Sequence, residues 1–426
     1  MMPASSDRAS MEAHQLAKLR PLLAALLDSN PFYSAKLGDL DRDVSSLTEF
    51  SRRVPFTFKQ ELVADQNGHP PYGSNLTFPL ERYSRFNQTS GTTGHPLRWL
   101  DTGESWEWML DCWTRVYQAA GVGEEDRVFF PFSFGPFLGF WVAFEAAARI
   151  GCLSIPGGGM RSSARIQTIL DNQVTVLCST PTYAIRMAEV AAEEGFDLSA
   201  SRVRRIIVAG EPGGGIPATR ALIERLWPGA RVADHHGMTE IGPVSYECPA
   251  RQGVLHVIEA AYFAEVIDPV SLEAVGPGGT GELVLTNLGR IGSPLLRYRT
   301  RDVVRRAVAA RCDCGSWELA LEGGILGRSD DMVVVRGVNL YPSAVEEIIR
   351  SCHGVGEFRV EVDGHRTLSE LSFEIEPQSE TVDPRELAHQ VESALRKAFS
   401  LRVSVSPVPC GTLPRFEAKA RRWIRR

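Results

Sequence analysis

The sequence contains very little lysine and no long apolar run. Lysine accounts for five of the 46 basic residues (Lys18, Lys36, Lys59, Lys397 and Lys419), and arginine for the other 41. No apolar stretch reaches the roughly 20 residues that a membrane-spanning helix needs, and residues 1–15 lack the pattern of a signal peptide. The net charge of −6 argues against a broad nucleic-acid-binding surface. We therefore expect a cytoplasmic protein that binds neither membranes nor nucleic acid.

The size and composition are those of a globular protein with more than one structural unit. A chain of 426 residues is long for a single compact core, and its 43% hydrophobic and 23% charged residues are ordinary proportions. In a reducing cytoplasm the eight cysteines do not form a disulfide framework. Most of them stand alone in apolar runs, which is typical of buried cysteine.

Strands and helices alternate in the first half of the chain. We predict strands at 127–132 and 175–180, a strand followed by a turn at 204–212, and helices at 11–30, 104–120, 140–151 and 181–195. This alternation indicates a mainly parallel α/β sheet flanked by helices.

The pattern changes after about residue 260. Short strands around 261–268 and 280–288 are separated by Pro-Gly-Gly-Thr and indicate an antiparallel or barrel-like β section. From about residue 330 the remaining residues, roughly 100, are predicted to form several strands and two helices, which indicates a small α+β unit. The predicted fold is thus α/β, with an N-terminal domain of residues 1–329 and a C-terminal domain of residues 330–426.

Residues 87–97, Asn-Gln-Thr-Ser-Gly-Thr-Thr-Gly-His-Pro-Leu, form a small, hydroxyl-rich segment. Glycines let backbone amides converge on an anion, and the hydroxyl groups add donors. The segment is not a Walker A motif, and no Gly-x-Gly-x-x-Gly follows the early strands. Read alone, it is either a phosphate-binding loop or an ordinary turn.

Five motifs in order decide between these readings. The loop 90–96 is followed by Asp-His-His-Gly-Met-Thr-Glu (234–240), Tyr-Arg-Thr-Arg-Asp (298–302), a junction at 327–349 and Leu-Pro-Arg-Phe-Glu-Ala-Lys (413–419). This series resembles the acyl-adenylate-forming enzymes. With Asn-Pro-Phe-Tyr and Val-Pro-Phe-Thr-Phe-Lys near the start, the chain is most similar to the phenylacetate–CoA ligase subfamily, over nearly its whole length.

The resemblance implies an enzyme that activates an aromatic carboxylic acid with ATP and transfers the acyl group to CoA, here in secondary metabolism. Glu240 would bind Mg²⁺, Asp302 would accept the ribose hydroxyls, and Arg328 would reach ribose or phosphate. Lys419 would bridge the acyl oxygen and the α-phosphate, although the basic tail around it would also suit an acidic partner. The other nucleotide-binding residues implied are Ser90, Gly91, Thr92, Thr93, Gly94, Glu211, Pro212, Asp234, His235, His236, Gly237, Met238 and Thr239, with Thr239 also near the chemistry.

Three positions depart from the family pattern. His95 replaces the usual lysine of the phosphate loop, so a positive contact there would depend on pH. Arg301 replaces the glycine before Asp302, which bears on the local backbone. His236 stands where a tyrosine normally stacks on adenine.

The family's C-terminal domain rotates between the two half-reactions, so we expect a mobile domain. Asp330 occupies the hinge position, and Gly337 lies where a strand approaches the pantetheine tunnel.

The acyl pocket is expected from the aromatic segment 129–141 together with 209–215 and 241–243. By resemblance, its walls include Phe134, Phe137, Gly210, His235, Ile241 and Gly242. An aromatic slot suits a flat aryl acid.

A second group of residues has the chemistry of a zinc site. Cys248 and His256 are separated by seven residues, and Cys312 and Cys314 by one. Thiolate and imidazole ligands suit a closed, structural Zn²⁺ site, and some phenylacetate–CoA-ligase-like proteins have a similar one. The alternative is a set of unrelated buried cysteines and a surface histidine.

Two other functions remain open at this point. The acyl acceptor would be a carrier-protein thiol or an amine instead of CoA, or the chain would bind nucleotide or acyl-adenylate without turnover. By resemblance we also expect a homodimer.

Overall fold

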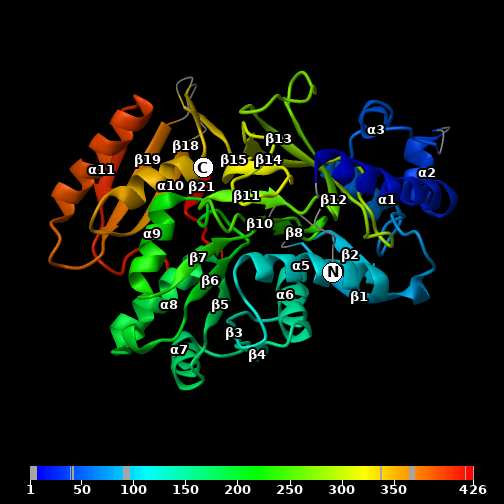
Figure 1. Cartoon of the computed structure of the whole chain (residues 1–426). Coiled ribbons are helices and arrows are strands. Elements are labelled where there is room, and N and C mark those ends of the chain that lie inside the picture. The colour runs from blue at the N-terminus through cyan, green and yellow to red at the C-terminus, as the bar shows by residue number, and fades with distance from the viewer. Residues whose placement is uncertain are drawn as a thin grey trace.

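The computed structural model of the chain describes residues 7–38, 40, 43–89, 96–335, 338–363, 370–417 and 419–425. Figure 1 shows the parallel sheet low in the centre of the molecule, the N-terminal helices on one side and the C-terminal α+β domain on the other. Among the described residues, no helix has the length and apolar character that a membrane span requires.

A five-stranded parallel sheet, of order β4-β3-β5-β6-β7, forms the centre of the large domain. Its strands are β3 (Arg127–Phe130), β4 (Leu153–Pro156), β5 (Val176–Ser179), β6 (Arg205–Val208) and β7 (Arg231–Asp234). The helices between them are α6 (Leu138–Arg149), α7 (Ser162–Asp171), α8 (Pro181–Glu194) and α9 (Pro217–Leu226). The predicted parallel α/β architecture is confirmed, whereas β4, β7, α7 and α9 had not been predicted.

Helix α8 shows how local chemistry sets these elements. The Thr180 hydroxyl accepts a hydrogen bond from the backbone N–H of Tyr183, and Pro181 occupies the first turn. The helix ends at Gly195, whose φ of 76° is the left-handed conformation that glycine favours.

A six-stranded antiparallel sheet of order β10-β11-β15-β14-β13-β12 confirms the predicted barrel-like section, as a curled half-barrel. Its strands are β10 (Ser245–Glu247), β11 (Val254–Val257), β12 (Tyr262–Ile267), β13 (Thr280–Asn287), β14 (Tyr298–Arg306) and β15 (Ala320–Arg328). Two hairpins flank the sheets: β1 (Tyr83–Gln88) with β2 (Arg98–Thr102), and β8 (Gly237–Met238) with β9 (Gly242–Pro243).

The N-terminal region is helical. Its helices are α1 (Arg8–Ser29), α2 (Pro31–Leu37), α3 (Leu47–Arg53), α4 (Lys59–Gly68) and α5 (Gly103–Ala119), and short 3₁₀ turns lie at Leu80–Arg82 and Leu198–Ala200. The leucine stripe of α1, including Leu19, Leu23 and Leu26, is buried in one cluster with Phe263 of β12. The stripe therefore attaches the first helices to the antiparallel sheet.

The C-terminal α+β domain has an apolar core of its own, built around Val345, Phe358 and Phe373. Its elements are β16 (Val333–Val335), β17 (Val338–Leu340), α10 (Pro342–Ser351), β18 (Val355–Asp363), β19 (Glu370–Pro377), α11 (Pro384–Phe399), β20 (Ser404–Pro407) and β21 (Trp423–Arg425). The main sheet has the order β20-β19-β18-β21, with β21 parallel to β18. The segment between β20 and β21, which contains Lys419, is thereby anchored at both ends.

Candidate active site

The residues singled out in the sequence gather at the carboxyl ends of the parallel strands. Gly210 and Glu211 lie just beyond β6, Asp234 is the last residue of β7, and His235 follows it. Ligands of open α/β sheets bind at this edge. The backbone of Gly323 and Gly324 in β15 packs against Gly215 and Asp234, and Lys419 of the C-terminal domain approaches Gly210. We refer to this meeting place of the parallel sheet, the antiparallel sheet and the Lys419 segment as the cleft.

Asp302 and Arg328 form one corner of the cleft. They are cross-strand partners on β14 and β15, and Arg328 donates to Asp302 Oδ1 at 3.3 Å. The other carboxylate oxygen, Oδ2, lies 3.0 Å from Nε2 of His236. Asp302 is 3% exposed, so both neighbours hold a nearly buried carboxylate in a fixed direction. His236 is thus tied to Asp302 by a hydrogen bond.

The backbone at Arg301 adopts the left-handed conformation that glycine favours. Its φ is 65°, in the left-handed region, and its N–H donates to Glu282 Oε1 at 3.1 Å. A non-glycine residue pays about 1–2 kcal/mol for this conformation. The side chain leans toward the junction, where its guanidinium lies 4.0 Å from Asp330.

Asp330 lies between β15 and β16, in the segment that joins the two domains. Its two carboxylate oxygens accept from Arg328 at 3.0 Å each, and its carbonyl accepts from Arg425 at 3.4 Å. Arg328 therefore connects the hinge candidate to Asp302.

Lys419 reaches the cleft from the C-terminal domain. A Cβ on Gly210 would lie 3.3 Å from Lys419 Cε, so this glycine leaves room for the lysine. Part of the Lys419 residue is exposed to solvent, but protein atoms surround its side chain. This desolvation lowers the pKa of the ammonium group, whereas the negative charges of Glu211 and Glu240 raise it by a smaller amount.

Glu211 fixes the position of the Lys419 segment. One carboxylate oxygen accepts from the backbone N–H of Thr182 at 2.9 Å, and the other from that of Ala420 at 2.8 Å. Burial raises the pKa of Glu211. Pro212 follows directly, and the glycines after it pack closely on Asp234, since a Cβ on Gly214 would lie 2.3 Å from Asp234 Oδ1.

Asp234 is itself enclosed. Burial, with Glu247 nearby, raises the pKa of Asp234 to about 7. Its side chain lies beneath the backbone of Gly214 and Gly215, so the structure gives it a packing role at the floor of the cleft.

The turn that contains Thr239 and Glu240 is held by a buried ion pair that the sequence did not reveal. Arg290 donates to both oxygens of Asp101 at 2.6 Å, and it also donates to the carbonyls of Thr239 at 2.7 Å and Glu240 at 3.1 Å. Both charged side chains are 0% exposed. The Glu240 side chain lies 3.1 Å from a further unpredicted residue, Lys59 at the start of α4.

His235 faces helix α5. Its ring centroid lies 4.4 Å from that of Trp113, and its Nδ1 lies 2.6 Å from the carbonyl oxygen of Ser245. A carbonyl only accepts, so Nδ1 carries the proton and Nε2 is an acceptor. Burial lowers the pKa of His235 to about 4, so the ring is neutral near pH 7.

The remaining pocket candidates fall into two groups. Ile241 belongs to the same buried cluster as Trp113, and Phe134 and Met238 pack against that cluster. A Cβ on Gly242 would lie 3.1 Å from the Tyr262 hydroxyl, and one on Gly237 would lie 2.9 Å from the Gly242 carbonyl, so both glycines permit close packing. Phe137 is not among the residues of this cluster, and its ring contacts that of Phe140 at a centroid distance of 6.0 Å.

The phosphate-loop candidates Ser90, Gly91, Thr92, Thr93 and Gly94, with His95 and Gly337, lie outside the described residues. The ends of the loop are described. Thr89 donates through its backbone N–H to Leu97 O at 2.9 Å, and Leu97 donates back to the Thr89 hydroxyl at 3.0 Å. These bonds close the β1–β2 hairpin on either side of the loop.

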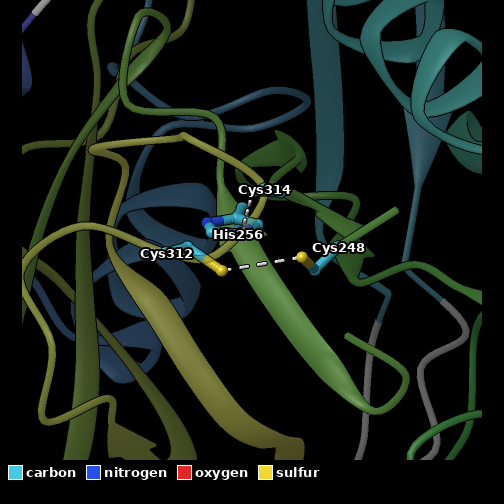
Figure 2. Close-up of side chains that lie close together, drawn as sticks. All are labelled: Cys248, His256, Cys312 and Cys314. Atoms are coloured by element: carbon cyan, nitrogen blue, oxygen red, sulfur yellow. Dashed lines mark hydrogen bonds between the residues drawn. The ribbon is translucent and has the colours of Figure 1, made fainter. Parts of the chain in front are cut away.

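The four zinc-ligand candidates do come together (Figure 2). Cys248 follows β10, His256 lies on β11, and Cys312 and Cys314 lie between β14 and β15. Their ligand atoms all lie within 4.8 Å of one another. The Cys248 and Cys312 sulfurs are 3.6 Å apart, and the Cys314 sulfur is 3.4 Å from His256 Nε2.

Comparisons with known proteins identify the family of the chain. Residues 85–289 match the model of the AMP-binding enzymes, and residues 337–426 match that of the AMP-binding enzyme C-terminal domain. The chain is 30% identical to phenylacetate–coenzyme A ligase of Pseudomonas putida, over 99% of this chain and 94% of that protein. It is 29% identical to the same enzyme of Thermus thermophilus, over 98% and 97%.

A solved structure matches the whole fold. It is a 2-hydroxyisobutyryl-CoA ligase in its post-adenylation state with an acyl-AMP, with a TM-score of 0.92, 26% identity, and coverage of 99% of this chain and 91% of that one. The same ligase in its thioester-forming state gives 0.71. The two domains are therefore arranged as in the post-adenylation state. From these matches, the chain belongs to the AMP-binding enzymes, in the family of the phenylacetate–coenzyme A ligases.

Proposed function

We propose that this chain activates an aromatic carboxylic acid with ATP and transfers the acyl group to CoA. The observation that carries the proposal is the meeting of Lys419, Glu240 and the Asp302–Arg328 pair at one cleft, in a chain related over its full length to phenylacetate–coenzyme A ligases. The 2-hydroxyisobutyryl-CoA ligase structure with CoA supports CoA as the acceptor.

In the first half-reaction a carboxylate oxygen of the acid attacks the α-phosphorus of ATP. The bond from that phosphorus to the bridging oxygen breaks, and pyrophosphate leaves with the electron pair. Lys419 would neutralise charge that develops at the α-phosphate and the acyl oxygen. Asp302, already fixed by two neighbours, would accept the ribose hydroxyls, and Arg328 would hold the same edge of the nucleotide.

Glu240 fits a magnesium ligand. Its carboxylate is nearly buried and lies 3.1 Å from Lys59, and Mg²⁺ prefers oxygen ligands together with substrate phosphates. The ion would neutralise the triphosphate when bound. Arg290 would keep Glu240 in place by fixing the two carbonyls of its turn.

The acid would lie between helix α5 and the turn after β7. Trp113, Phe134 and Ile241 offer an apolar slot, which suits a flat aromatic ring. His235 Nε2 would accept a hydrogen bond from a ring substituent that carries a donor.

The cluster of Cys248, His256, Cys312 and Cys314 would hold a structural Zn²⁺. Bond lengths of about 2.3 Å to sulfur and 2.0–2.1 Å to nitrogen imply a sulfur–sulfur edge of about 3.8 Å and a sulfur–nitrogen edge of about 3.5–3.6 Å in a tetrahedron. The observed 3.6 Å between the Cys248 and Cys312 sulfurs and 3.4 Å between the Cys314 sulfur and His256 Nε2 lie within about 0.2 Å of these edges. All four positions are taken by protein, so the ion would brace the sheet and take no part in the reaction.

The domains would divide at residues 329 and 330, with Asp330 as the hinge. Rotation about it would withdraw Lys419 and open the cleft to the CoA thiol. A homodimer remains a prediction by family resemblance.

ATP–pyrophosphate exchange tests the proposal. The chain with Mg²⁺ and no CoA would be assayed against phenylacetic, benzoic, cinnamic, hydroxybenzoic and aminobenzoic acids, and against short-chain aliphatic acids for comparison. Exchange with one acid, followed by a thioester when CoA is added, is the expected result. Exchange without thioester would refute the CoA step, and exchange with aliphatic acids alone would refute the aromatic assignment.

A further inference from the structure

The segment that contains Lys419 continues into two adjacent arginines with opposite environments. Arg421 is exposed, whereas Arg422 is 8% exposed. Burying a guanidinium group is costly unless carboxylates and hydrogen bonds compensate its charge. The partners of Arg422 therefore show what its burial achieves, three residues after Lys419.

On one side, Arg422 is bound to the core of its own domain. Its Nε and Nη2 donate to the two carboxylate oxygens of Glu357 on β18, at 2.7 and 3.0 Å. Glu357 also accepts from Arg350 of α10 at 3.2 Å. The backbone carbonyl of Arg422 accepts from the N–H of Val360 at 2.8 Å, just before β21 pairs with β18. Side chain and backbone thus fix Arg422 to the same strand.

On the other side, the remaining end of the guanidinium group faces the large domain. Its Nη1 lies 3.5 Å from the hydroxyl of Thr182, in the first turn of α8. Nη1 also lies 3.7 Å from Glu346 of α10, which accepts from the hydroxyl of Thr219 in α9 at 3.4 Å. Helices α9 and α10 lie side by side (Figure 1). Arg422 therefore lies at the contact between the two domains.

Thr182 connects this contact to the Lys419 segment a second time. Its backbone N–H donates to one carboxylate oxygen of Glu211 at 2.9 Å, and the other oxygen accepts from the N–H of Ala420 at 2.8 Å. The first turn of α8 thus receives both Ala420, through Glu211, and Arg422, through the Thr182 hydroxyl. Lys419 directly precedes these two attachment points.

We propose that Arg422 is a positioning residue that holds Lys419 beside Gly210 during adenylation, by linking Glu357 of the C-terminal domain to Thr182 of the large domain. The inference rests on the proposed function and adds a residue that acts through Lys419 without contacting the substrate. Three residues span at most about 10 Å of chain, so a shift of Arg422 moves Lys419. A misplacement of about 1 Å at a reacting centre can cost about 10²-fold in rate.

A purely structural role for Arg422 predicts a different result. If Arg422 only stabilised the core of the C-terminal domain, a change at Thr182 would leave both half-reactions unaffected. A change at Arg422 would then slow both half-reactions together and lower the melting temperature. If Arg422 positions Lys419, changes on either side of the domain contact slow adenylation alone, because rotation of the C-terminal domain would separate Arg422 from Thr182 before thioester formation.

Measuring the two half-reactions separately distinguishes these cases. Pyrophosphate exchange, and thioester formation from a supplied acyl-adenylate, would be compared for Thr182→Val, Thr182→Ser, Arg422→Lys and the double variant Thr182→Val with Arg422→Lys. The acid would be the one that gives exchange with the unmodified chain. Thr168→Val is the matched control, because the Thr168 hydroxyl donates to the Ala164 carbonyl within its own helix, α7.

We expect Thr182→Val to lower kcat for exchange about fivefold, as for one lost hydrogen bond to a charged group, with KM for ATP and for the acid unchanged. Thr182→Ser keeps a hydroxyl group and should retain the rate. Arg422→Lys loses the planar, bidentate donor and should lower kcat about tenfold or more. The double variant should lose no more than Arg422→Lys alone, since both changes remove the same contact. Thioester formation should stay within about twofold throughout.

Exchange that is unchanged in Thr182→Val, or a loss that is equal in both half-reactions, would overturn the inference and leave the proposed function standing. Independent losses that multiply in the double variant would overturn it too. Melting temperatures report folding, and the Thr182 variants decide the question even if Arg422→Lys does not fold. If the unmodified chain gives no exchange with any acid, the proposed function fails and the inference fails with it.

Discussion

At the scale of single residues, Lys419 carries the sharpest prediction. Lys419→Ala removes the only ammonium group that the C-terminal domain contributes to the cleft, among the described residues. We expect pyrophosphate exchange to fall about 10²- to 10³-fold, as when a transition-state donor is lost. Thioester formation from a supplied acyl-adenylate should stay within about threefold, because Lys419 would have left the cleft by then.

Arg421→Ala is the control, because Arg421 is exposed and lies two residues away. Equal loss of both half-reactions in Lys419→Ala would contradict the assigned role and indicate a general effect on the domain.

Arg301 allows a test of backbone strain. Its φ of 65° suits glycine, so Arg301→Gly should leave the free energy of unfolding within about 1 kcal/mol, since relief of strain opposes the greater entropy of the unfolded chain. Arg301→Val should lose more than about 1 kcal/mol, because a β-branched residue tolerates this region poorly. Urea unfolding measures both, and equal stability of the two variants would count against strain at this position.

The order of the motifs predicted the candidate site residues, whereas the contacts of these residues depend on the tertiary structure. Asp302 and Arg328 were predicted from motifs that turned out to be strand partners. Lys59 and Trp113 were not singled out, because a lysine at the start of a helix and a tryptophan inside one look like surface and core. Their partners, Glu240 and His235, lie more than a hundred positions away in the sequence.

At the scale of elements, the proposed zinc site of Cys248, His256, Cys312 and Cys314 would brace the edge of the antiparallel sheet. We expect the purified chain to contain one equivalent of zinc, and a chelator or Cys312→Ser should reduce bound zinc to below one equivalent and lower the melting temperature. Loss of a structural zinc costs folding free energy directly. Metal analysis and calorimetry measure the two effects, and an unchanged melting temperature with the metal removed would contradict a structural role.

Strand β10 connects the cluster to the proposed acyl pocket. Cys248 directly follows β10, and the carbonyl of Ser245 on β10 accepts from His235. Because Cys312→Ser or zinc removal should loosen β10, we expect either change to raise KM for the acid several-fold more than KM for ATP.

The pair of Arg290 and Asp101 joins β2 to the turn of Glu240. Arg290→Met leaves a fully buried carboxylate without its partner and should cost about 3–5 kcal/mol. Adding Asp101→Asn should recover part of this, because the unpaired charge is then gone. A double variant whose loss equals the sum of the two single losses would show that the side chains are not coupled.

Elements bounded by proline, glycine and hydroxyl residues were predicted well, as α8 shows. Strand β4, Leu-Ser-Ile-Pro, was not, because it is an edge strand with an exposed Leu153 and no alternating pattern. Its place follows from pairing with β3, which is a property of the sheet.

At the scale of the whole molecule, the contacts between the two domains include hydrogen bonds and an ion pair, which can break without disrupting either core. Glu347 of α10 accepts from the backbone N–H of Ala218 in α9 at 2.7 Å, and Arg415 lies 3.5 Å from Glu189 of α8. Glu211 holds the N–H of Ala420. Interfaces of this kind permit relative motion. The sequence predicted both domains, but their arrangement depends on such pairwise contacts and had to come from the structure.

Glu347 offers a way to shift this arrangement without touching the cleft. Its carboxylate lies at the N-terminus of α9, where a negative charge contributes about 1 kcal/mol. Glu347→Ala should therefore weaken the arrangement that brings Lys419 to Gly210 by roughly fivefold in population. We expect slower pyrophosphate exchange, and thioester formation from a supplied acyl-adenylate that is unchanged or faster. Glu386→Ala, at an exposed position of α11, should alter neither rate. If Glu347→Ala slowed both half-reactions equally, the contact would serve the stability of the fold, and the balance between the two domain arrangements would be set elsewhere.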